Sequence, residues 1–228
     1  MSASSNDAEQ SAKEEYLRSG KVPMSYALRQ GVVSMVRDPL LFIAAGMPGP
    51  LGYKGRQILY RRFFKRMGKG VVVDPNVRLI GCNRLEVDDF SFLGWGCEMH
   101  IPEGFVSIGK RCHVTGWVLG HEGVEIEDYV ACGGTLLSVT DSSRGGHRMG
   151  GPMIPREQRH LRRGKVVVEK DAFIARNSTV MPGVTIGEGA VVGPFSLVMQ
   201  DVKPWTVVAG VPAVKTSVRE KVKFPDPD

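Results

Sequence analysis

Between Val168 and Val198 an aliphatic residue returns at every sixth position without a change of register. The positions are Val168, Ile174, Val180, Ile186, Val192 and Val198. Four positions after each comes a small or β-branched residue: Ala172, Ser178, Val184, Ala190, Ser196 and Val202. Apolar positions of a helix lie three and four apart and those of a strand two apart, so a period of six fits neither. It predicts a chain that turns a corner every six residues, with one aliphatic side chain pointing inward from each flat face.

A less regular form of the repeat precedes this stretch. The six-residue step is kept by Val87, Leu93 and Met99, by Ile108 and Val114, and by Ile126 and Cys132. The residues assigned to the position four later are Ser91, Cys97, Cys112, Val118, Val130 and Leu136. Three such faces close one triangular coil, and stacked coils bury a continuous apolar column. We therefore predict an all-β fold, a parallel β-helix, over residues 71–215.

The repeat is interrupted after Leu136 and resumes at Val168. Residues 139–166 are predicted to leave the coil as one long loop excursion, which contains several glycines and two prolines. A loop of this length in a tightly wound solenoid is more often functional than decorative. The excursion carries Asp141 and His147, which makes both candidate site residues.

The flanking segments have a different composition. Residues 1–20 are polar and predict a disordered tail, residues 21–70 a helical segment, and residues 216–228 a C-terminal tail. An apolar run at residues 40–45 is bounded by Pro39 and Pro48. It is too short for a membrane-spanning helix, which needs about 20 apolar residues.

Residues 53–67 predict a basic amphipathic helix. Its apolar stripe would be Ile58, Leu59, Phe63 and Phe64, with Arg56, Arg61, Arg62, Lys65 and Arg66 on the remaining surface. Two interpretations stay open: a cap packed on the first coil, or an interfacial helix beside anionic lipid head groups. Nucleic acid is not expected as a partner, because the cations lack an aromatic stacking platform and a recognisable binding motif.

Composition adds little beyond these boundaries. The chain has 228 residues, a net charge of +6 and 28 glycines, which suit tight corners. Its four cysteines (Cys82, Cys97, Cys112 and Cys132) are far apart and form no C-x-x-C pair. We interpret them as reduced, mostly buried thiols of a cytoplasmic protein rather than as disulfides or metal ligands.

The repeat, together with the segment Val208-Ala209-Gly210-Val211-Pro212-Ala213, resembles the hexapeptide-repeat acyltransferases, whose fold is the left-handed parallel β-helix. The resemblance covers residues 70–220. It implies transfer of an acyl group, most simply acetyl, from coenzyme A to a hydroxyl or amine of a sugar, sugar nucleotide or lipid-linked glycan. Because one scaffold serves many acceptors in this family, the fold does not identify the substrate.

Acyl transfer of this kind needs a base to take the acceptor proton, and histidine suits that role. Galactoside-type and maltose-type relatives carry the base after a coil ending, where this chain has Ser142 or Ser143. The excursion is more similar to the surface-polysaccharide and sugar-nucleotide branch, through Asp141, Met149, Pro152 and Pro155. That branch carries a histidine before an inward aliphatic residue, which His113-Val114 matches.

Five histidines therefore compete for the role of base. His113 should point outward from a coil, where it faces a neighbouring subunit, and His147 could reach an acceptor from the excursion. His100 and His121 each lie thirteen residues after a coil start, so they are expected to stack on one edge, and His160 lies among arginines. Three histidines at the spacing of a zinc site are absent, so no metal is expected.

The resemblance also implies a coenzyme A groove between subunits. The matching positions in this chain are Arg176, Pro194, Met199 and Gln200, with Lys215 and Arg219 near the phosphates. It further implies a homotrimer, in which outward apolar residues such as Phe173 and Leu197 are covered. The alternatives are a β-helix scaffold without catalytic activity, a transferase with a non-sugar acceptor, and a β-helical metalloenzyme.

Overall fold

The computed structural model describes Glu15, Lys21, Met24 and residues 39–40, 42–141 and 161–221. The chain divides into two compact units, Met1–Gly46 and Met47–Asp228. In the first unit residues 39–40 and 42–46 are helical. The predicted tail at residues 1–20 lies outside the described residues, apart from Glu15. No helix in the described ranges has the length and apolar character needed to cross a bilayer.

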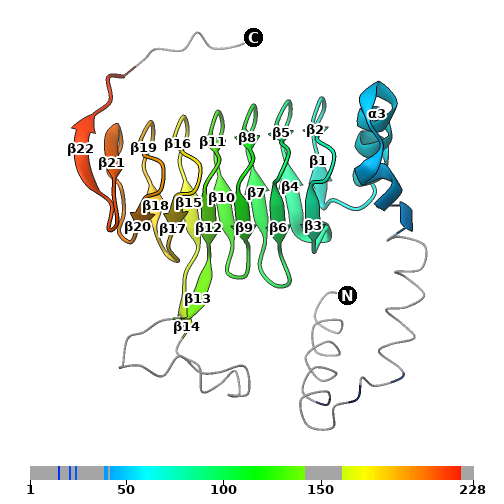
Figure 1. Ribbon diagram of the computed structural model, residues 1–228, viewed down its shortest axis with the longest axis horizontal. Coiled ribbons are helices and arrows are strands. Elements are labelled where there is room, and N and C mark those ends of the chain that lie inside the picture. The colour runs from blue at the N-terminus through cyan, green and yellow to red at the C-terminus, as the bar shows by residue number, and fades with distance from the viewer. Residues whose placement is uncertain are drawn as a thin grey trace. The chain divides into compact units, whose positions relative to one another are not determined.

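The second unit is a parallel β-helix with three flat faces (Figure 1). The first face consists of β1 (Arg66–Met67), β4 (Leu85–Val87), β7 (Val106–Ile108), β10 (Val124–Ile126), β15 (Val166–Val168) and β18 (Thr185–Ile186). The second consists of β2 (Val72–Val73), β5 (Phe92–Leu93), β8 (His113–Val114), β11 (Ala131–Cys132), β16 (Phe173–Ile174), β19 (Val191–Val192), β21 (Thr206–Ala209) and β22 (Val214–Val218). The third consists of β3 (Arg78–Ile80), β6 (Glu98–His100), β9 (Trp117–Leu119), β12 (Thr135–Leu137), β17 (Thr179–Val180) and β20 (Leu197–Val198). Visiting the faces in turn, the chain forms the left-handed β-helix that the six-residue repeat predicts.

The apolar column fills the inside of this coil. On the second face the inward residues Leu93, Val114, Cys132, Ile174 and Val192 stand in one register. Each is at most 1% exposed. Each of these five strands is two residues long, so the stability of the coil comes from stacking its turns rather than from any single strand.

Two corners between the second and third faces are shorter than the sequence predicts. Only Thr115 and Gly116 separate β8 from β9, and only Gly133 and Gly134 separate β11 from β12. We call these four residues the short corners. Val118 and Leu136 consequently pair with Met99 and Val180 as inward residues of the third face. The prediction that these two residues are the small residues of a corner was wrong. Each corner is two residues shorter, so the position four after Val114 or Cys132 is already the inward position of the third face.

Glycine makes the short corners sterically allowed. A methyl group on Gly116 would collide with the carbonyl oxygen of Gly134 in the next coil. The other coils join the same two faces through four residues, for example residues 175–178 between β16 and β17. The turn of the chain is therefore indented at two successive levels of the stack.

The long excursion leaves and re-enters the coil as a two-stranded antiparallel arm. Its strands are β13 (Val139–Asp141) and β14 (Leu161–Arg163), and residues 142–160 between them lie outside the described residues. Val166 already pairs with Val124, so the coil resumes at that residue, inside the predicted range 139–166. At the other end β22 crosses the predicted boundary at residues 215 and 216, because it pairs antiparallel with β21.

The predicted helix at residues 53–67 is wrong in both bounds and faces. Helix α3 spans Gly49–Tyr60, a 3₁₀ turn (η1) spans Cys82–Arg84, and Arg66–Met67 is the strand β1. Ile58 of the predicted apolar stripe is 72% exposed, whereas Arg56 of the predicted polar surface is 0% exposed. The Arg56 guanidinium is buried because its Nε donates to the Val73 carbonyl (2.7 Å) and its Nη1 to the Met47 carbonyl (2.6 Å).

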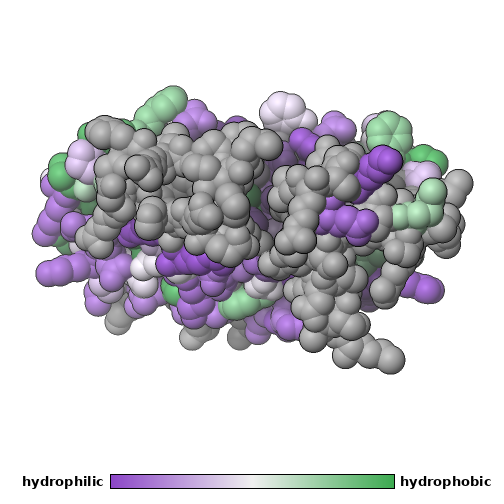
Figure 2. Space-filling model, turned by 90° about the horizontal axis from the view of Figure 1, so that it is seen from below, coloured by the Kyte–Doolittle hydropathy of each residue, from purple (hydrophilic) through white to green (hydrophobic). Residues whose placement is uncertain are grey.

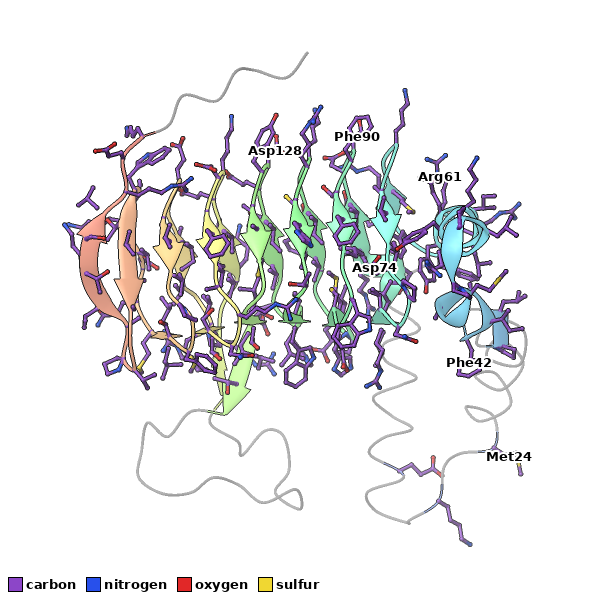
Figure 3. All side chains as sticks on the ribbon, turned by 45° about the horizontal axis from the view of Figure 1, so that its top comes forward. Met24, Phe42, Arg61, Asp74, Phe90 and Asp128 are labelled. Atoms are coloured by element: carbon purple, nitrogen blue, oxygen red, sulfur yellow. The ribbon has the colours of Figure 1, made fainter. Side chains whose placement is uncertain are left out.

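Further contacts hold α3 against the first coil. The Tyr53 hydroxyl donates to Asp74 Oδ1 at 3.0 Å, and Gln57 Nε2 donates to the Val71 carbonyl at 3.2 Å. Figure 3 labels Asp74 at the edge of the coil beside this helix. Helix α3 therefore closes the open end of the apolar column, as the cap interpretation predicted.

Candidate active site

His113 stands at the exposed surface of the second face. It is the outward residue of β8, next to Val114, which is 0% exposed. Its imidazole meets the Phe92 ring edge-on, with the ring centroids 4.7 Å apart. The alternation of strand side chains thus directs the imidazole outward, and the aromatic neighbour restricts its orientation.

The imidazole extends toward the corner between the second and third faces. A Cβ added to Gly94 would lie 3.3 Å from His113 Nε2 and 2.5 Å from the Thr115 methyl carbon. The hydrogen side of Gly94 therefore faces Nε2, and no side chain of this residue covers it. The first short corner begins at Thr115, two residues after His113. Because this corner lacks two residues, less backbone covers the surface beside Nε2, the nitrogen that is open to an acceptor.

Two large side chains border this region. Trp95 is 66% exposed, and its amide donates to Asp74 Oδ2 at 3.0 Å. Arg176 is exposed two coils beyond the first short corner, with its Cγ beside Gly133. Pro194 follows on the same corner in the next coil, where the Phe195 amide donates to the Arg176 carbonyl at 3.3 Å. The sequence analysis missed Trp95, although its flanking glycines mark an open corner.

A second site lies at the C-terminal end of the coil. It is a groove of about 1340 Å³. Three of the predicted coenzyme A residues, Met199, Gln200 and Lys215, line it. Arg162, Arg163 and Lys203 line it too, and sequence analysis missed all three. Arg162 Nη2 donates to the Met199 carbonyl at 3.2 Å. This hydrogen bond holds strand β14, where the excursion arm rejoins the coil, against the groove. Figure 2 shows hydrophilic and apolar patches alternating over the described surface visible in that view.

Arg219 does not join this groove. Its guanidinium pairs with Asp171 Oδ2 at 3.1 Å, donates to the Asp171 carbonyl at 2.8 Å and lies over the Trp205 ring, 5.6 Å from its centroid. Lys215 and Arg219 stand at opposite ends of the β22 hairpin return, about 13 Å apart at the rise of an extended strand. That both residues attract the nucleotide phosphates stays a prediction; in this structure Arg219 ties the C-terminal strand to the coil.

Of the other predicted site residues, the structure describes His100, His121 and the backbone of Asp141. His100 and His121 are neighbours on one edge, as predicted, but their rings meet edge to face rather than stacked, with centroids 5.7 Å apart and 77° between the ring planes. His147 and His160 lie outside the described residues. Asp141 ends β13, where its backbone pairs with Leu161. Among the residues that the structure describes, no three His, Cys, Asp or Glu side chains are grouped to hold a metal ion.

All four cysteines are free thiols, and Cys97, Cys112 and Cys132 are buried. Burial raises the pKa of Cys112 to about 11 and that of Cys132 to about 12, and it raises the pKa of Cys97 as well. A nucleophilic cysteine reacts as the thiolate, which needs a lowered pKa and access to solvent. These three thiols are therefore unsuited to carry an acyl group, which favours direct transfer to an acceptor.

Comparisons with known proteins agree with this geometry. The family model "Bacterial transferase hexapeptide (six repeats)" matches residues 165–200. A dTDP-4-amino-4,6-dideoxy-D-glucose acyltransferase of Escherichia coli is 30% identical over 168 residues, which cover 69% of this chain and 84% of that protein. The putative lipopolysaccharide biosynthesis O-acetyl transferase WbbJ of Escherichia coli K12 is 33% identical over 136 residues, covering 51% and 69%.

Solved structures give the same picture. AntD, an N-acyltransferase from Bacillus cereus in complex with dTDP and 3-hydroxybutyryl-CoA, superposes with a TM-score of 0.65 at 26% identity, covering 72% of this chain and 88% of that one. A hexapeptide-repeat acetyltransferase from Vibrio cholerae, complexed with acetyl coenzyme A, gives a TM-score of 0.56 at 21% identity, covering 92% and 99%. The second likeness concerns the fold alone.

Proposed function

Because the chain belongs to the hexapeptide-repeat acyltransferases, we propose that it transfers an acyl group from coenzyme A to a sugar nucleotide, with His113 as the general base. The observation that carries the proposal is the position of His113, whose Nε2 faces the uncovered side of Gly94 at an exposed surface. Acyl-coenzyme A as donor is the chemistry of the family, and its similar structures hold coenzyme A or its acyl esters.

The reaction needs one proton acceptor and no covalent enzyme intermediate. Nε2 of His113 takes the proton from the acceptor hydroxyl or amine while its oxygen or nitrogen attacks the thioester carbonyl. The tetrahedral intermediate then breaks its carbon–sulfur bond, and the sulfur of coenzyme A leaves with the proton that the imidazolium returns. Base catalysis of this kind contributes roughly 10²–10⁴-fold to the rate.

The terminal groove suits the phosphorylated end of the donor. Arg162, Lys203 and Lys215 supply positive charge to its lining, and Pro212 and Ala213 supply apolar surface. Charged donors of this kind bind phosphate oxygens through short, strong hydrogen bonds. We assign the phosphates to these three cations rather than to Arg219, whose charge is already paired with Asp171.

Base and groove lie apart on one chain. The groove lies at the C-terminal end of the coil, where Met199 and Lys215 line it, whereas His113 lies on β8, the third strand of the second face. Along the coil axis, β8 is four strand spacings, about 19 Å, from β21, whose Thr206 and Val208 line the groove. A second copy that brings its groove against His113 would complete the site. The exposed Trp117 and Phe173, 47% and 46% exposed, would be covered in the same contact, which supports the predicted homotrimer.

Trp95 favours a nucleotide-linked acceptor over a neutral glycan. Its indole is 66% exposed beside Gly94 and offers a flat apolar surface on which a pyrimidine base can stack. Arg176 lies on the same corner and can pair with a diphosphate. Two similar proteins are named for, or crystallised with, a dTDP compound.

Replacing His113 by glutamine tests the proposed base. We expect kcat to fall roughly 10²–10⁴-fold in an assay of thiol release from acetyl-CoA with a dTDP-amino sugar, because glutamine cannot take the proton. Coenzyme A affinity and the melting temperature should stay at the wild-type values. His100→Gln is the matched control, since the His100 ring meets that of His121 edge to face, away from the short corners. Full activity of His113→Gln would remove His113 as the base and leave His147 as the next candidate.

A calorimetric titration with coenzyme A separates an enzyme from a scaffold without catalytic activity. Saturable heat that weakens in Lys215→Gln but not in Lys170→Gln is expected, because Lys215 lines the groove and Lys170 stands at another corner. If the titration with coenzyme A gave no saturable heat, the alternative of a β-helix scaffold without catalytic activity would be favoured. Sugars without a nucleotide and non-sugar amines serve as competing acceptors. Cytoplasmic location and membrane contact through residues 53–67 stay predictions; the latter takes a different form on α3.

A further inference from the structure

Helix α3 has two opposite faces. Gly52, Arg56 and Tyr60, four residues apart, are buried against the first coil. Leu51, Lys54 and Ile58 follow the spacing of three and four that defines one helix face, and they project on the opposite side. Leu51 is 79% and Ile58 72% exposed. Two aliphatic side chains thus flank a lysine on the surface that points away from the coil.

A pocket adjoins this face where α3 ends. It has a volume of about 540 Å³ and is lined by Gln57, Ile58, Arg61, Arg62, Lys69 and Gly70. Three of these six residues are cations. Figure 3 labels Arg61, which projects from the helical end of the unit. The only acidic contact of Lys69 in the described part of the chain is made by its backbone amide, which donates to Asp89 Oδ1 at 2.6 Å.

The next two cations along the chain behave differently. Lys65 pairs with Glu86 at 2.6 Å, and Arg66 pairs with Asp88 at 2.9 Å. No carboxylate lies within ion-pair distance of Arg61, Arg62 or Lys69 in the described ranges, and the Arg61 contact is a 3.3 Å hydrogen bond to the Gly68 carbonyl. Carboxylates of the coil therefore neutralise Lys65 and Arg66, whereas the charges of Arg61, Arg62 and Lys69 stay available at the pocket.

We propose that this surface docks the capped end of the β-helix on an anionic lipid membrane. Leu51 and Ile58 would insert at the level of the head groups, and Arg61, Arg62 and Lys69 would hold a lipid phosphate in the pocket. An interfacial helix needs this combination of a small apolar surface and adjacent cations, and membrane affinity grows with both. The arrangement differs from the stripe expected from sequence, because Phe64 is buried in the coil.

A lipid surface fits this chemistry better than a nucleic acid does. Exposed aliphatic side chains have no partner on a phosphate backbone. Of the two tyrosines of this helix, Tyr60 is buried and Tyr53 is hydrogen-bonded to Asp74. The docking surface includes none of the residues assigned to acyl transfer. Its failure and that of the proposed function are therefore separate results, since one is measured with vesicles and the other by thiol release.

Sedimentation with vesicles tests the proposal on the full chain. Wild-type protein should bind vesicles of phosphatidylcholine mixed with phosphatidylglycerol, should not bind phosphatidylcholine alone, and should be released by salt. Arg61→Gln, Arg62→Gln and Lys69→Gln combined should weaken binding on the order of 100-fold. Each cation near an anionic surface typically contributes about fivefold to the affinity, and three are removed. Leu51→Gln and Ile58→Gln should each weaken it roughly tenfold.

The charge-matched control is Lys110→Gln, Lys170→Gln and Lys221→Gln combined, which removes the same charge from exposed positions of the coil and tail. It should leave binding unchanged. Equal loss in this control, or wild-type binding to phosphatidylcholine alone, would overturn the proposal. So would binding of inorganic phosphate at the pocket without any vesicle binding. Melting temperature and thiol-release activity of the α3 variants should match the wild type, because the replaced side chains are exposed.

Discussion

Residues 106–137 and residues 166–198 build the same kind of coil but join its second and third faces differently. In the first region Thr115–Gly116 and residues 133–134 make the turn with two residues. In the second region residues 175–178 and 193–196 make it with four. The inward residues of both regions remain in register across all three faces.

The difference separates packing from chemistry. The regular region keeps every sixth residue aliphatic and presents a full corner, which suffices to stack coils. The short corners keep the same inward column but withdraw the backbone beside His113. A repeat that is broken only at the corner therefore changes the outer surface without changing the core. We infer that such breaks, rather than the repeat itself, indicate where a β-helix of this kind performs chemistry.

The largest effect should come from a charge inside the regular column. Val180→Asp places a carboxylate where the side chain is 0% exposed, and burying an unpaired charge costs several kcal/mol. We expect loss of cooperative folding, measured by circular dichroism and by soluble yield. The control is Thr179→Asp, the outward neighbour on the same strand, which should fold. If both variants fold equally well, the inward column does not hold the coil together.

A methyl group at a short corner should have the next largest effect. Gly116→Ala would place its Cβ against the Gly134 carbonyl oxygen, so the backbone must move. Overpacking of this kind costs typically 1–3 kcal/mol, and contact with backbone favours the upper end, roughly 3 kcal/mol. The free energy of unfolding in urea measures it. Gly193→Ala in a full corner is the comparison, since its Cβ would lie 2.9 Å from the Ala209 methyl, a milder overlap than that of Gly116 with a carbonyl oxygen.

The corner variants also test the link to function. A loss of acyl transfer in Gly116→Ala that is larger than its loss of stability explains would assign the short corner to the site. If Gly116→Ala and Gly193→Ala lose stability and activity in the same proportion, the two corner types differ in length alone. That outcome would contradict the distinction between packing and chemistry.

Sequence analysis predicted the parts of this molecule that repeat. Val168 to Val198 fixed the period, and the structure follows it residue by residue. Val118 was misassigned because the short corner places the inward residue of the third face four positions after Val114. In a full coil, the residue four positions after an inward aliphatic residue is the small one at the corner. Arg56 was placed wrongly, and the contacts of Arg219 were not foreseen, because charge predicts exposure on average. Each of these guanidinium groups is held by backbone carbonyls that sequence cannot locate. The groove cations Arg162 and Lys203 come together only through coil closure.

The two regions also differ inside the coil, where the first region has buried thiols. We expect replacement of one of these thiols to have the smallest effect of the changes proposed. Cys112 occupies the small position that Ala172 and Ala190 occupy in the regular region. Burial raises the pKa of its thiol from 9.0 to about 11. The folded chain therefore keeps this proton over a pH range in which the unfolded chain has lost it. Stability is retained below pH 9 and falls between pH 9 and 11, by about 2 kcal/mol for this thiol at about 1.4 kcal/mol per pKa unit.

Cys112→Ala should flatten that part of the alkaline stability loss. Alanine fits the position in two other coils, so the variant should remain close to wild type at neutral pH and become relatively more stable as the pH rises. Urea unfolding at a series of pH values from neutral to about pH 11, where the raised pKa lies, measures the slope. Val130→Ala, the same position in the next coil without a thiol, should lower stability equally at every pH. An unchanged slope in Cys112→Ala would mean that the alkaline transition belongs to other groups, and that the two regions differ at the surface alone.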